Sequence, residues 1–319
     1  MKDLSPPHQE ALSQSIKQRT SAIMDNELAA NSVKSYRSDF QHFVSWCDQI
    51  KASPLPASAS LLIAYLSAFS SSFKYSTLSR RVAAIRKQQE MHGLSSPSDH
   101  VEVKRFMKSL RRTLVREKVL CKPAAALQQE TLKPLIENFA LETILDYRNR
   151  AILMLSYTGA FRRSELAALD YDDLIYSNKG VSIHLRQSKT DQFAKGAYKA
   201  LPFNLAEPSF CPVRILNEYL ALANIESGAV FRTIKGRKSK VQLSNNRLST
   251  TDIYRIVKRY AVNFSPHSLR AGFITDAKEK NLPDSSIMVQ TGHQSVQMIH
   301  HYGRHKTIWQ GNAVNEIFK

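Results

Sequence analysis

The stretch that decides the fold reads Pro266-His267-Ser268-Leu269-Arg270, then Thr291-Gly292-His293, then His300-His301-Tyr302-Gly303-Arg304. A His and an Arg three residues apart are followed by a second His, and a Tyr comes nine residues after that His. If the chain folds so that these groups meet, the tyrosine hydroxyl can attack a phosphodiester while Arg and His side chains stabilise the developing charge. The stretch therefore suggests a phosphoryl-transfer site, against which the rest of the chain can be tested.

The charge of the chain predicts a polyanionic partner. Its 319 residues include 45 Lys and Arg against 27 Asp and Glu, a net charge of +18. Residues 1–73 are neutral, with 6 basic and 6 acidic side chains, whereas residues 74–122 hold 13 basic and 4 acidic ones. A second basic segment, 232–259, has 9 basic side chains against the single Asp252. Two separate clusters favour a nucleic-acid-binding surface over general solubility.

The cysteines and the apolar runs indicate the compartment. Cys47, Cys121 and Cys211 are far apart and form no CxxC pair, which is typical of reduced thiols in a cytosolic protein without a zinc site. The first residues are too polar for a signal peptide, and the apolar run 61–69 is far shorter than the ~20 residues that span a bilayer. The nucleotide-binding pattern GxxxxGK[ST] is absent. We expect a cytoplasmic protein that needs no cofactor, no metal and no membrane.

The first third of the chain predicts a compact four-helix domain, residues 29–118, behind a polar leader, residues 1–28. Asn31-Ser32 can cap the first helix, the prolines in 52–58 end it, and apolar residues recur at helical spacing in 61–69, 76–87 and 103–114. The last two helices carry most of the charge. The basic residues expected to contact DNA here are Lys74, Arg80, Arg81, Arg86, Lys87, Lys104, Arg105, Lys108, Arg111 and Arg112.

Residues 119–127 lack clear periodicity and are predicted to link this domain to a second one, residues 128–319. The alternative is a loop inside a single larger helical domain. In the second domain, 150–157 predicts a buried helix that ends at Gly159, and 212–223 predicts another. The alternating stretches 180–187 and 198–203 predict a β-hairpin with Lys189 at its mouth. The segment 232–240 is predicted to be a basic loop, whose Arg237, Lys238 and Lys240 would also contact DNA.

Taken singly, the candidate residues have ordinary structural explanations: His267 as a core histidine, Arg270 as a surface cation, Tyr302 as a partly buried helix residue. Together they fit phosphoryl transfer. Arginine donates two parallel hydrogen bonds to phosphate oxygens and stays protonated. Histidine or lysine can move the proton of the nucleophile and that of the leaving oxygen. A tyrosine, with an ordinary pKa near ~10, needs such neighbours to become a nucleophile.

The order of five motifs resembles the signature of the tyrosine recombinase (phage integrase) family. They are Thr158-Gly159-Ala160-Phe161-Arg162-Arg163-Ser164-Glu165-Leu166, Ser188-Lys189-Thr190, His267-Ser268-Leu269-Arg270, Gly292-His293 and Tyr302. The resemblance covers the chain from about Leu127 to the end, and the four-helix region resembles the family's core-binding (SAM-like) domain. It implies a mainly α fold, with a mixed α+β catalytic domain that contains a small antiparallel β-sheet.

The resemblance also implies roles for six residues. Arg162 and Arg270 would hold the scissile phosphate, Lys189 would protonate the 5′ leaving oxygen, and His267 would assist proton transfer to and from the nucleophile. His293 would donate a hydrogen bond to a phosphate oxygen. Tyr302 would form a 3′-phosphotyrosyl link. Arg162 matches the first family arginine because it lies three residues before Glu165, although by itself either Arg162 or Arg163 is better explained as solvent-facing.

A recombinase of this family would clamp double-stranded DNA at a specific site and act as a homotetramer, with accessory DNA-bending or directionality factors as further partners. Integration, excision or resolution of a mobile element or replicon are the expected roles. This chain departs from the family at Ala271-Gly272-Phe273, where many relatives have another His. Only 17 residues follow Tyr302; of these, Val314, Ile317 and Phe318 form an apolar stripe that a neighbouring subunit could receive. Glu165 is either a partner that orients Arg162 or a surface carboxylate.

Three alternatives remain open at this stage. One is a DNA-binding regulator that has lost catalysis, and another is a type IB topoisomerase, which shares the chemistry. The third is a metal-dependent nuclease or relaxase that uses His300, His301 and His305, but these lack a His-x-His pair or a carboxylate cluster.

Overall fold

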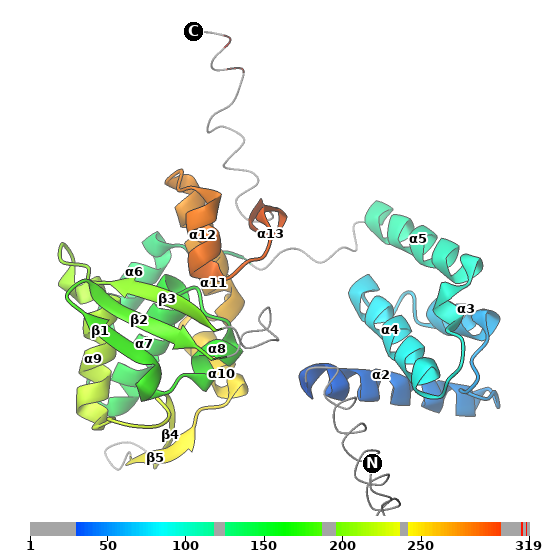
Figure 1. Ribbon diagram of the computed structural model, residues 1–319, viewed down its shortest axis with the longest axis horizontal. Coiled ribbons are helices and arrows are strands. Elements are labelled where there is room, and N and C mark those ends of the chain that lie inside the picture. Colours follow the sequence, from blue (N-terminus) through cyan, green and yellow to red (C-terminus); the bar gives the residue numbers. More distant parts are fainter. Residues whose placement is uncertain are drawn as a thin grey trace, which may run out of the picture. The chain divides into compact units, whose positions relative to one another are not determined.

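The computed structural model describes residues 30–117, 125–186, 196–236 and 242–300, together with Val314 and Ile317. The chain divides into two compact units, Met1–Lys122 and Pro123–Lys319. Each unit has its own hydrophobic core, and the two are described separately (Figure 1). In the part of the chain that the structure describes, no helix has the length and apolar character needed to cross a bilayer.

Within residues 30–117, the N-terminal unit consists of four α-helices, as the sequence predicts. They are α2 (Ala30–Gln49), α3 (Ala59–Ala68), α4 (Tyr75–Met91) and α5 (Val101–Arg116), with the 3-10 turn η1 (Pro97–Asp99) before α5 (Figure 1). Ser58 caps α3 by accepting a hydrogen bond from Leu61 N. The side chains at the centre of the unit are fully buried and come from α2, α3 and α4: Phe43, Cys47, Leu62, Tyr65, Leu66, Leu78 and Ile85.

One of the predicted DNA contacts in this unit, Arg81, is buried. Arg81 lies on the inner face of α4, where it is only 6% exposed. Its Nη1 donates to Tyr65 Oη at 2.8 Å, and its guanidinium lies 3.9 Å from the centre of the Phe73 ring. Arg81 was expected to contact DNA, but its guanidinium is held inside the aromatic cluster, with Nε 3.6 Å from Asp39 Oδ1.

The C-terminal unit places helices around a small sheet. Its elements are α6 (Gln129–Glu137), α7 (Ile144–Thr158), α8 (Arg163–Ala168), η2 (Tyr171–Asp173), β1 (Leu174–Ser177), β2 (Gly180–Leu185), β3 (Ala197–Pro202), η3 (Pro208–Phe210), α9 (Pro212–Ala223), β4 (Arg232–Lys235), β5 (Gln242–Arg247), α10 (Thr250–Tyr260), α11 (Pro266–Glu279), α12 (Asp284–Thr291) and α13 (Val296–His300). The strands form an antiparallel sheet in the order β1-β2-β3 and a separate β4-β5 ribbon (Figure 1). The unit is therefore mainly helical with small antiparallel sheets, which confirms the predicted fold class.

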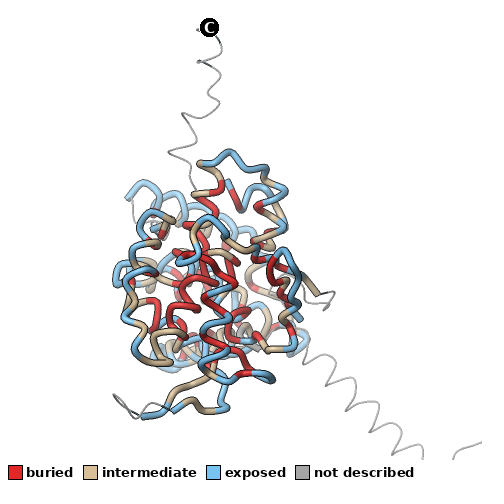
Figure 2. Tube along the Cα trace, turned by 90° about the vertical axis from the view of Figure 1, so that its left-hand side faces the viewer, coloured by how far each residue is buried: buried red, intermediate tan, exposed pale blue. Residues whose placement is uncertain are grey.

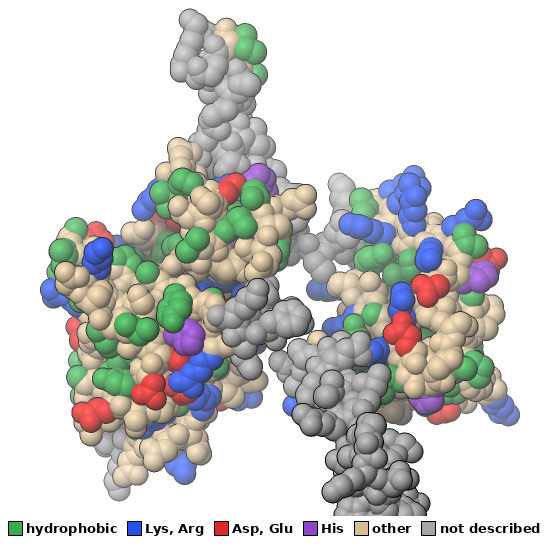
Figure 3. Space-filling model, in the orientation of Figure 1, with side chains coloured by type: hydrophobic (Ala, Val, Ile, Leu, Met, Phe, Trp, Pro, Cys, Tyr) green, Lys and Arg blue, Asp and Glu red, His purple; other side chains and the backbone are tan. Residues whose placement is uncertain are grey.

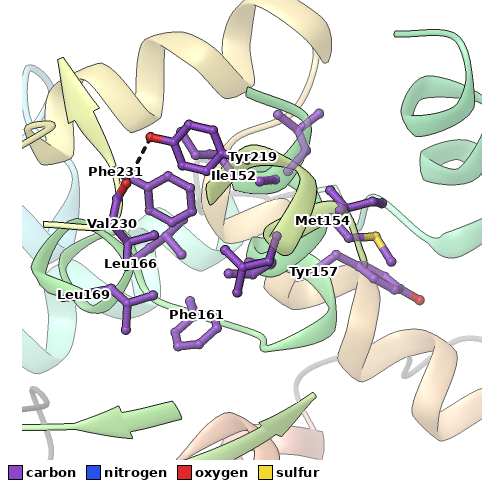
Figure 4. Packing of buried hydrophobic residues seen from close by; sticks show 14 of the residues in the cluster. Ile152, Met154, Tyr157, Phe161, Leu166, Leu169, Tyr219, Val230 and Phe231 are labelled. Carbon is purple, nitrogen blue, oxygen red and sulfur yellow. Dashed lines mark hydrogen bonds between the residues drawn. The ribbon is translucent and has the colours of Figure 1, made fainter. Parts of the chain in front are cut away.

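Helix α7 runs through the middle of this unit. It packs against α9 and α11, and its residues 148–157 are buried on every side. Figure 2 shows that the buried positions gather in the interior, and Figure 4 shows Ile152, Met154 and Tyr157 among the side chains of the cluster. Tyr219 satisfies its hydroxyl by donating to Val230 O at 2.9 Å, so this core holds a large polar-tipped ring without an unpaired donor (Figure 4).

The sheet differs from the sequence prediction in two places. Strand β1 was not predicted; it pairs with β2 from Leu174↔Ile183 to Ser177↔Gly180. The segment predicted as a basic loop begins as a strand, β4, which pairs with β5. The charged residues at both ends of β4 hid the strand pattern in the sequence, although Thr233 and Ile234 are β-branched residues that favour strands.

The last residue of the predicted linker, 119–127, packs against the C-terminal unit. Leu127 is fully buried, and its N–H donates to Ser268 O on α11 at 2.9 Å. A Cβ on Gly272 would lie 1.8 Å from Leu127 O, so only glycine allows the backbone to approach α11 this closely. Leu127 therefore packs with the C-terminal unit and lies against the helix that carries His267 and Arg270.

Candidate functional site

Arg162 and Glu165 form a cap at the start of α8. Arg162 N donates to Glu165 Oε2 at 2.9 Å, and Arg162 Nη1 lies 2.5 Å from Glu165 Oε1. The Glu165 side chain is 1% exposed and that of Arg162 is 20% exposed. Arg163 points the other way, toward the ring of Tyr254. Of the two explanations for Glu165 that the sequence left open, the structure supports the partner that orients Arg162.

Arg270 and His293 meet beneath Arg162. Arg270 is only 2% exposed; its Nη1 donates to Ala160 O at 2.5 Å and its Nη2 lies 3.1 Å from His293 Nε2. Because an arginine only donates, His293 Nε2 accepts, and the ring proton is on Nδ1, 2.8 Å from Thr291 Oγ1. Burial and then the charges of Arg270 and Arg162 lower the pKa of His293 to about 4. This histidine is therefore neutral at pH 7.

His267 lies one turn before Arg270 on α11, at the mouth of the same cluster. The residue as a whole is exposed. The partial burial of its ring lowers its pKa, and the charges of Arg270 and Arg162 lower it further. A histidine with a lowered pKa is neutral near pH 7 and can accept a proton, as a general base requires.

A buried lysine that the sequence analysis missed completes the cluster. Lys199 is on β3 opposite Ile183, and its side chain is 2% exposed. Its Nζ donates to Gly159 O at 2.6 Å, Gln290 O at 2.8 Å and Ala160 O at 3.3 Å. Alternation along β3 places Lys199 on the same inward face as Leu201, and this is the pattern that could have revealed it.

The structure thus brings together four of the six predicted catalytic residues, Arg162, His267, Arg270 and His293, from α8, α11 and the turn after α12. Lys189 and Tyr302 lie outside the described residues. So do three predicted DNA contacts, Arg237, Lys238 and Lys240, and the histidines His301 and His305.

The predicted DNA contacts of the N-terminal unit differ in their surroundings. Arg80 is bound to Asp39, and Arg86 to Glu90 and Asp99. Lys87 is half-buried, whereas Lys74 is exposed at the start of α4. The basic residues of α5 are exposed, and Figure 3 shows Lys and Arg side chains gathered over this helix. They are Lys104, Arg105, Lys108, Arg111 and Arg112.

His300, which one alternative assigns to a metal site, binds a carboxylate instead. Its Nε2 lies 3.0 Å from Asp284 Oδ2, and Lys278 binds the other oxygen of the same carboxylate. Within the described ranges, no three His, Cys, Asp or Glu side chains are grouped in a way that could hold a metal ion.

Comparison with known proteins agrees with this geometry. The model of the phage integrase family matches residues 126–307. The integrase/recombinase xerD homolog of Selenomonas ruminantium is 33% identical over 308 residues, 92% of this chain and 87% of the relative. The tyrosine recombinase XerC of Myxococcus xanthus is 26% identical over 85% of this chain and 86% of its own length.

Solved structures show the same fold at lower sequence identity. A lambda integrase dimer bound to a COC′ core site aligns with a TM-score of 0.59 at 14% identity, over 95% of this chain and 81% of that one. The Tn1549 transposon integrase in complex with transposon right end DNA aligns with a TM-score of 0.58 at 15% identity, over 95% and 96%. The chain therefore belongs to the phage integrase family of tyrosine recombinases, enzymes that cleave and rejoin DNA in site-specific recombination.

Proposed function

We propose that this chain cleaves DNA with Tyr302 and rejoins it through a 3′-phosphotyrosyl intermediate, with Arg162, Lys189, His267, Arg270 and His293 as the other catalytic groups. The observation that carries the proposal is the convergence of Arg162, Arg270, His267 and His293, which are up to 131 residues apart in the chain. Two guanidinium groups and two neutral imidazoles at one place suit a phosphate that gains charge in the transition state.

In the proposed step, the Tyr302 oxygen bonds to phosphorus while the bond from phosphorus to the 5′ oxygen breaks. The phenolic proton passes to His267, whose lowered pKa favours the neutral, accepting form. Lys189 gives a proton to the 5′ oxygen. Arg162 and Arg270 neutralise the phosphate, and His293 adds a hydrogen bond to one of its oxygens. Religation reverses these transfers, and the phosphotyrosyl bond conserves the energy needed to join a new strand.

The hydrogen bonding of His293 must change before it can donate to the phosphate. In the structure its Nε2 accepts from Arg270, so a hydrogen bond to phosphate requires the ring proton to move to Nε2 or a second proton to bind. A negatively charged phosphate beside the ring favours protonation and opposes the lowering of its pKa. We therefore propose that the binding of DNA converts His293 from an acceptor to a donor.

The two units would bind opposite sides of a specific double-stranded DNA site. The exposed cations of α5 supply phosphate contacts on one side, and the segment 232–259 supplies them beside the catalytic pocket. Arg81, which is buried, is not among these contacts. Exchange between two sites requires four strand cleavages, so a homotetramer on DNA is proposed, in the cytoplasm, for integration, excision or resolution of a mobile element or replicon. Accessory DNA-bending or directionality factors would decide which reaction prevails.

The central test compares wild-type protein with Tyr302→Phe on a nicked suicide substrate taken from DNA flanking the gene. The wild-type protein should form a covalent protein–DNA adduct that resists denaturation, in the presence of EDTA as well as without it, and Tyr302→Phe should bind the same DNA without forming it. An adduct with Tyr302→Phe would show that another residue is the nucleophile. A wild-type protein that binds but never forms the adduct would support the non-catalytic regulator, and relaxation of supercoils that lack the site would support a topoisomerase.

A further inference from the structure

We propose that Lys199 is a positioning residue for the cleavage reaction: its ammonium group ties the turn before Arg162 to the end of the helix before His293. This inference rests on the proposed cleavage function. It concerns a residue ten positions after Lys189, the lysine with the assigned catalytic role, and it follows from contacts that lie entirely within the described residues.

The ammonium group is fully used by backbone acceptors. A lysine has three N–H donors, and those of Lys199 point at Gly159 O, Ala160 O and Gln290 O at 2.6, 3.3 and 2.8 Å. A lysine that donates to a leaving oxygen would have to give up one of these bonds. The geometry therefore assigns Lys199 to holding the backbone and leaves the transfer of a proton to another group.

The three acceptors belong to the ends of two helices. Gly159 caps the C-terminus of α7, Ala160 follows it, and Gln290 lies in the last turn of α12. Carbonyls at helix C-termini carry partial negative charge, and a cation placed against two such ends is stabilised by both. Glu165 Oε2 lies 3.8 Å from the ammonium group and adds a full negative charge. These charges explain how the unit tolerates a lysine in its interior.

Both turns that Lys199 joins are followed within three residues by a proposed catalytic residue. Arg162 comes two residues after Ala160, and His293 three residues after Gln290. Ala160 has a positive φ of 45°, a backbone conformation that is strained for an alanine. Its carbonyl accepts from both Lys199 and Arg270. Lys199 thus helps to hold a strained turn in the one conformation that directs Arg162 at Glu165 and at Gly292 O.

The Gln290 side chain makes a second, independent tie at the same place. Its Nε2 donates to Thr158 O at 2.9 Å and to Ala200 O at 3.1 Å, so it joins α12 to the end of α7 and to β3. Gln290 is only partly buried, so its truncation is less disruptive to the core than a change at Lys199.

The experiment measures the single-turnover rate of covalent adduct formation at saturating protein, alongside the Kd for the same DNA and the Tm. Lys199→Met keeps the apolar stem and removes the charge; it should slow cleavage roughly 100-fold, the effect of a ~1 Å misplacement, with the Kd within about twofold of wild type. Lys179→Met, which removes an exposed lysine from the turn between β1 and β2, is the matched control and should cleave at the wild-type rate.

A pH series separates positioning from a purely structural role. Burial and the charges of Arg270 and Arg162 lower the pKa of Lys199 to about 7, whereas an arginine stays protonated. The ratio of the wild-type cleavage rate to that of Lys199→Arg should therefore fall as pH rises from 6 to 8.5. Taking this ratio cancels the titration of groups that both proteins share.

The outcomes are distinct from those of the Tyr302 test, because every rate is compared with a wild-type protein that forms the adduct. Wild-type cleavage by folded Lys199→Met, or a loss of DNA affinity equal to the loss of rate, overturns the proposal. If Lys199→Met does not fold, Gln290→Ala decides. If Gln290→Ala cleaves several-fold more slowly than wild type at an unchanged Kd, the connection between the two turns is supported. If Gln290→Ala cleaves at the wild-type rate and the ratio of the wild-type rate to the Lys199→Arg rate does not change with pH, the proposal is overturned.

Discussion

Glu165 binds Arg162 through both of its carboxylate oxygens, one on the backbone N–H at 2.9 Å and the other on Nη1 at 2.5 Å. A single buried carboxylate thus sets both the start of α8 and the direction of the arginine that begins it. The same carboxylate lies 3.8 Å from the ammonium group of Lys199.

The first prediction concerns this carboxylate. Glu165→Gln keeps the size of the side chain and removes its charge, so two cations lose their shared partner. We expect the rate of adduct formation to fall by at least about tenfold and the protein to lose on the order of 3 kcal/mol of stability, the cost of breaking a buried ion pair. Glu226→Gln, a change at an exposed position, should alter neither quantity. Equal rates for Glu165→Gln and wild type would show that Arg162 does not depend on this partner.

The second prediction concerns Gly272. Helix propensity alone predicts that Gly272→Ala in α11 stabilises the protein by about 1 kcal/mol. The new Cβ would lie 1.8 Å from Leu127 O, however, so backbone must move, and we expect a net destabilisation of about 1–3 kcal/mol. Denaturant unfolding of Gly272→Ala and wild type shows whether the free energy of unfolding rises or falls. Gly93→Ala is the control, because there a Cβ meets nothing within 4 Å and only the cost of a positive φ applies.

The third prediction follows from the neutral state of His293. Its pKa is about 4 in the folded protein and near its ordinary 6.5 in the unfolded chain. Between these values the unfolded chain binds the extra proton, so the stability due to this group is complete above pH 6.5 and is lost as pH falls toward 4. As pH falls from 6.5 to 4, the free energy of unfolding of the wild type should decrease by up to about 3 kcal/mol relative to that of His293→Gln. A difference that stays constant from pH 7 to 4 would contradict the assignment.

The fourth prediction contrasts two arginines of the N-terminal unit. Arg81→Met should destabilise residues 30–117, because it removes the Nη1 donor of the Tyr65 hydroxyl and one of the two guanidinium groups that pair with the buried Asp39. Arg105→Met should leave the Tm unchanged and reduce the salt dependence of DNA binding by about one unit of slope. Thermal unfolding and binding titrations at several salt concentrations separate the two effects. A stable Arg81→Met protein with weakened binding would return Arg81 to the DNA surface.

The sequence predicted the parts of the fold that repeat a simple pattern. The four N-terminal helices and the β2–β3 hairpin follow from spacing of three to four residues and of two, because one face of each element must be apolar. Strand β4 was mistaken for a loop because its ends are charged. Strand β1 has only four residues and shows no alternation of apolar and polar side chains. Arg162 and Arg163 are equivalent by residue type; only the entry angle of α8 decides which one faces Glu165.

Only those residues of the candidate site that belong to a sequence motif could be predicted. Arg162, His267, Arg270 and His293 were found through the resemblance to the family, and the structure shows that they meet. Lys199 carries no motif, and its role depends on three backbone carbonyls from distant turns, which no local pattern can specify. The buried position of Arg81 was missed for the converse reason. Helical spacing predicts only approximately which face of α4 a residue lies on, and the guanidinium packs inward over the ring of Phe73.

The hydrogen bond from Leu127 N to Ser268 O has a practical consequence for how the protein can be divided. Ser268 lies between His267 and Arg270, and Gln129 N and the Gln128 side chain bind Asp276 on the same helix. A catalytic fragment that begins after Leu127 would lose the backbone segment that covers this part of α11. An isolated C-terminal half should therefore start upstream of Leu127.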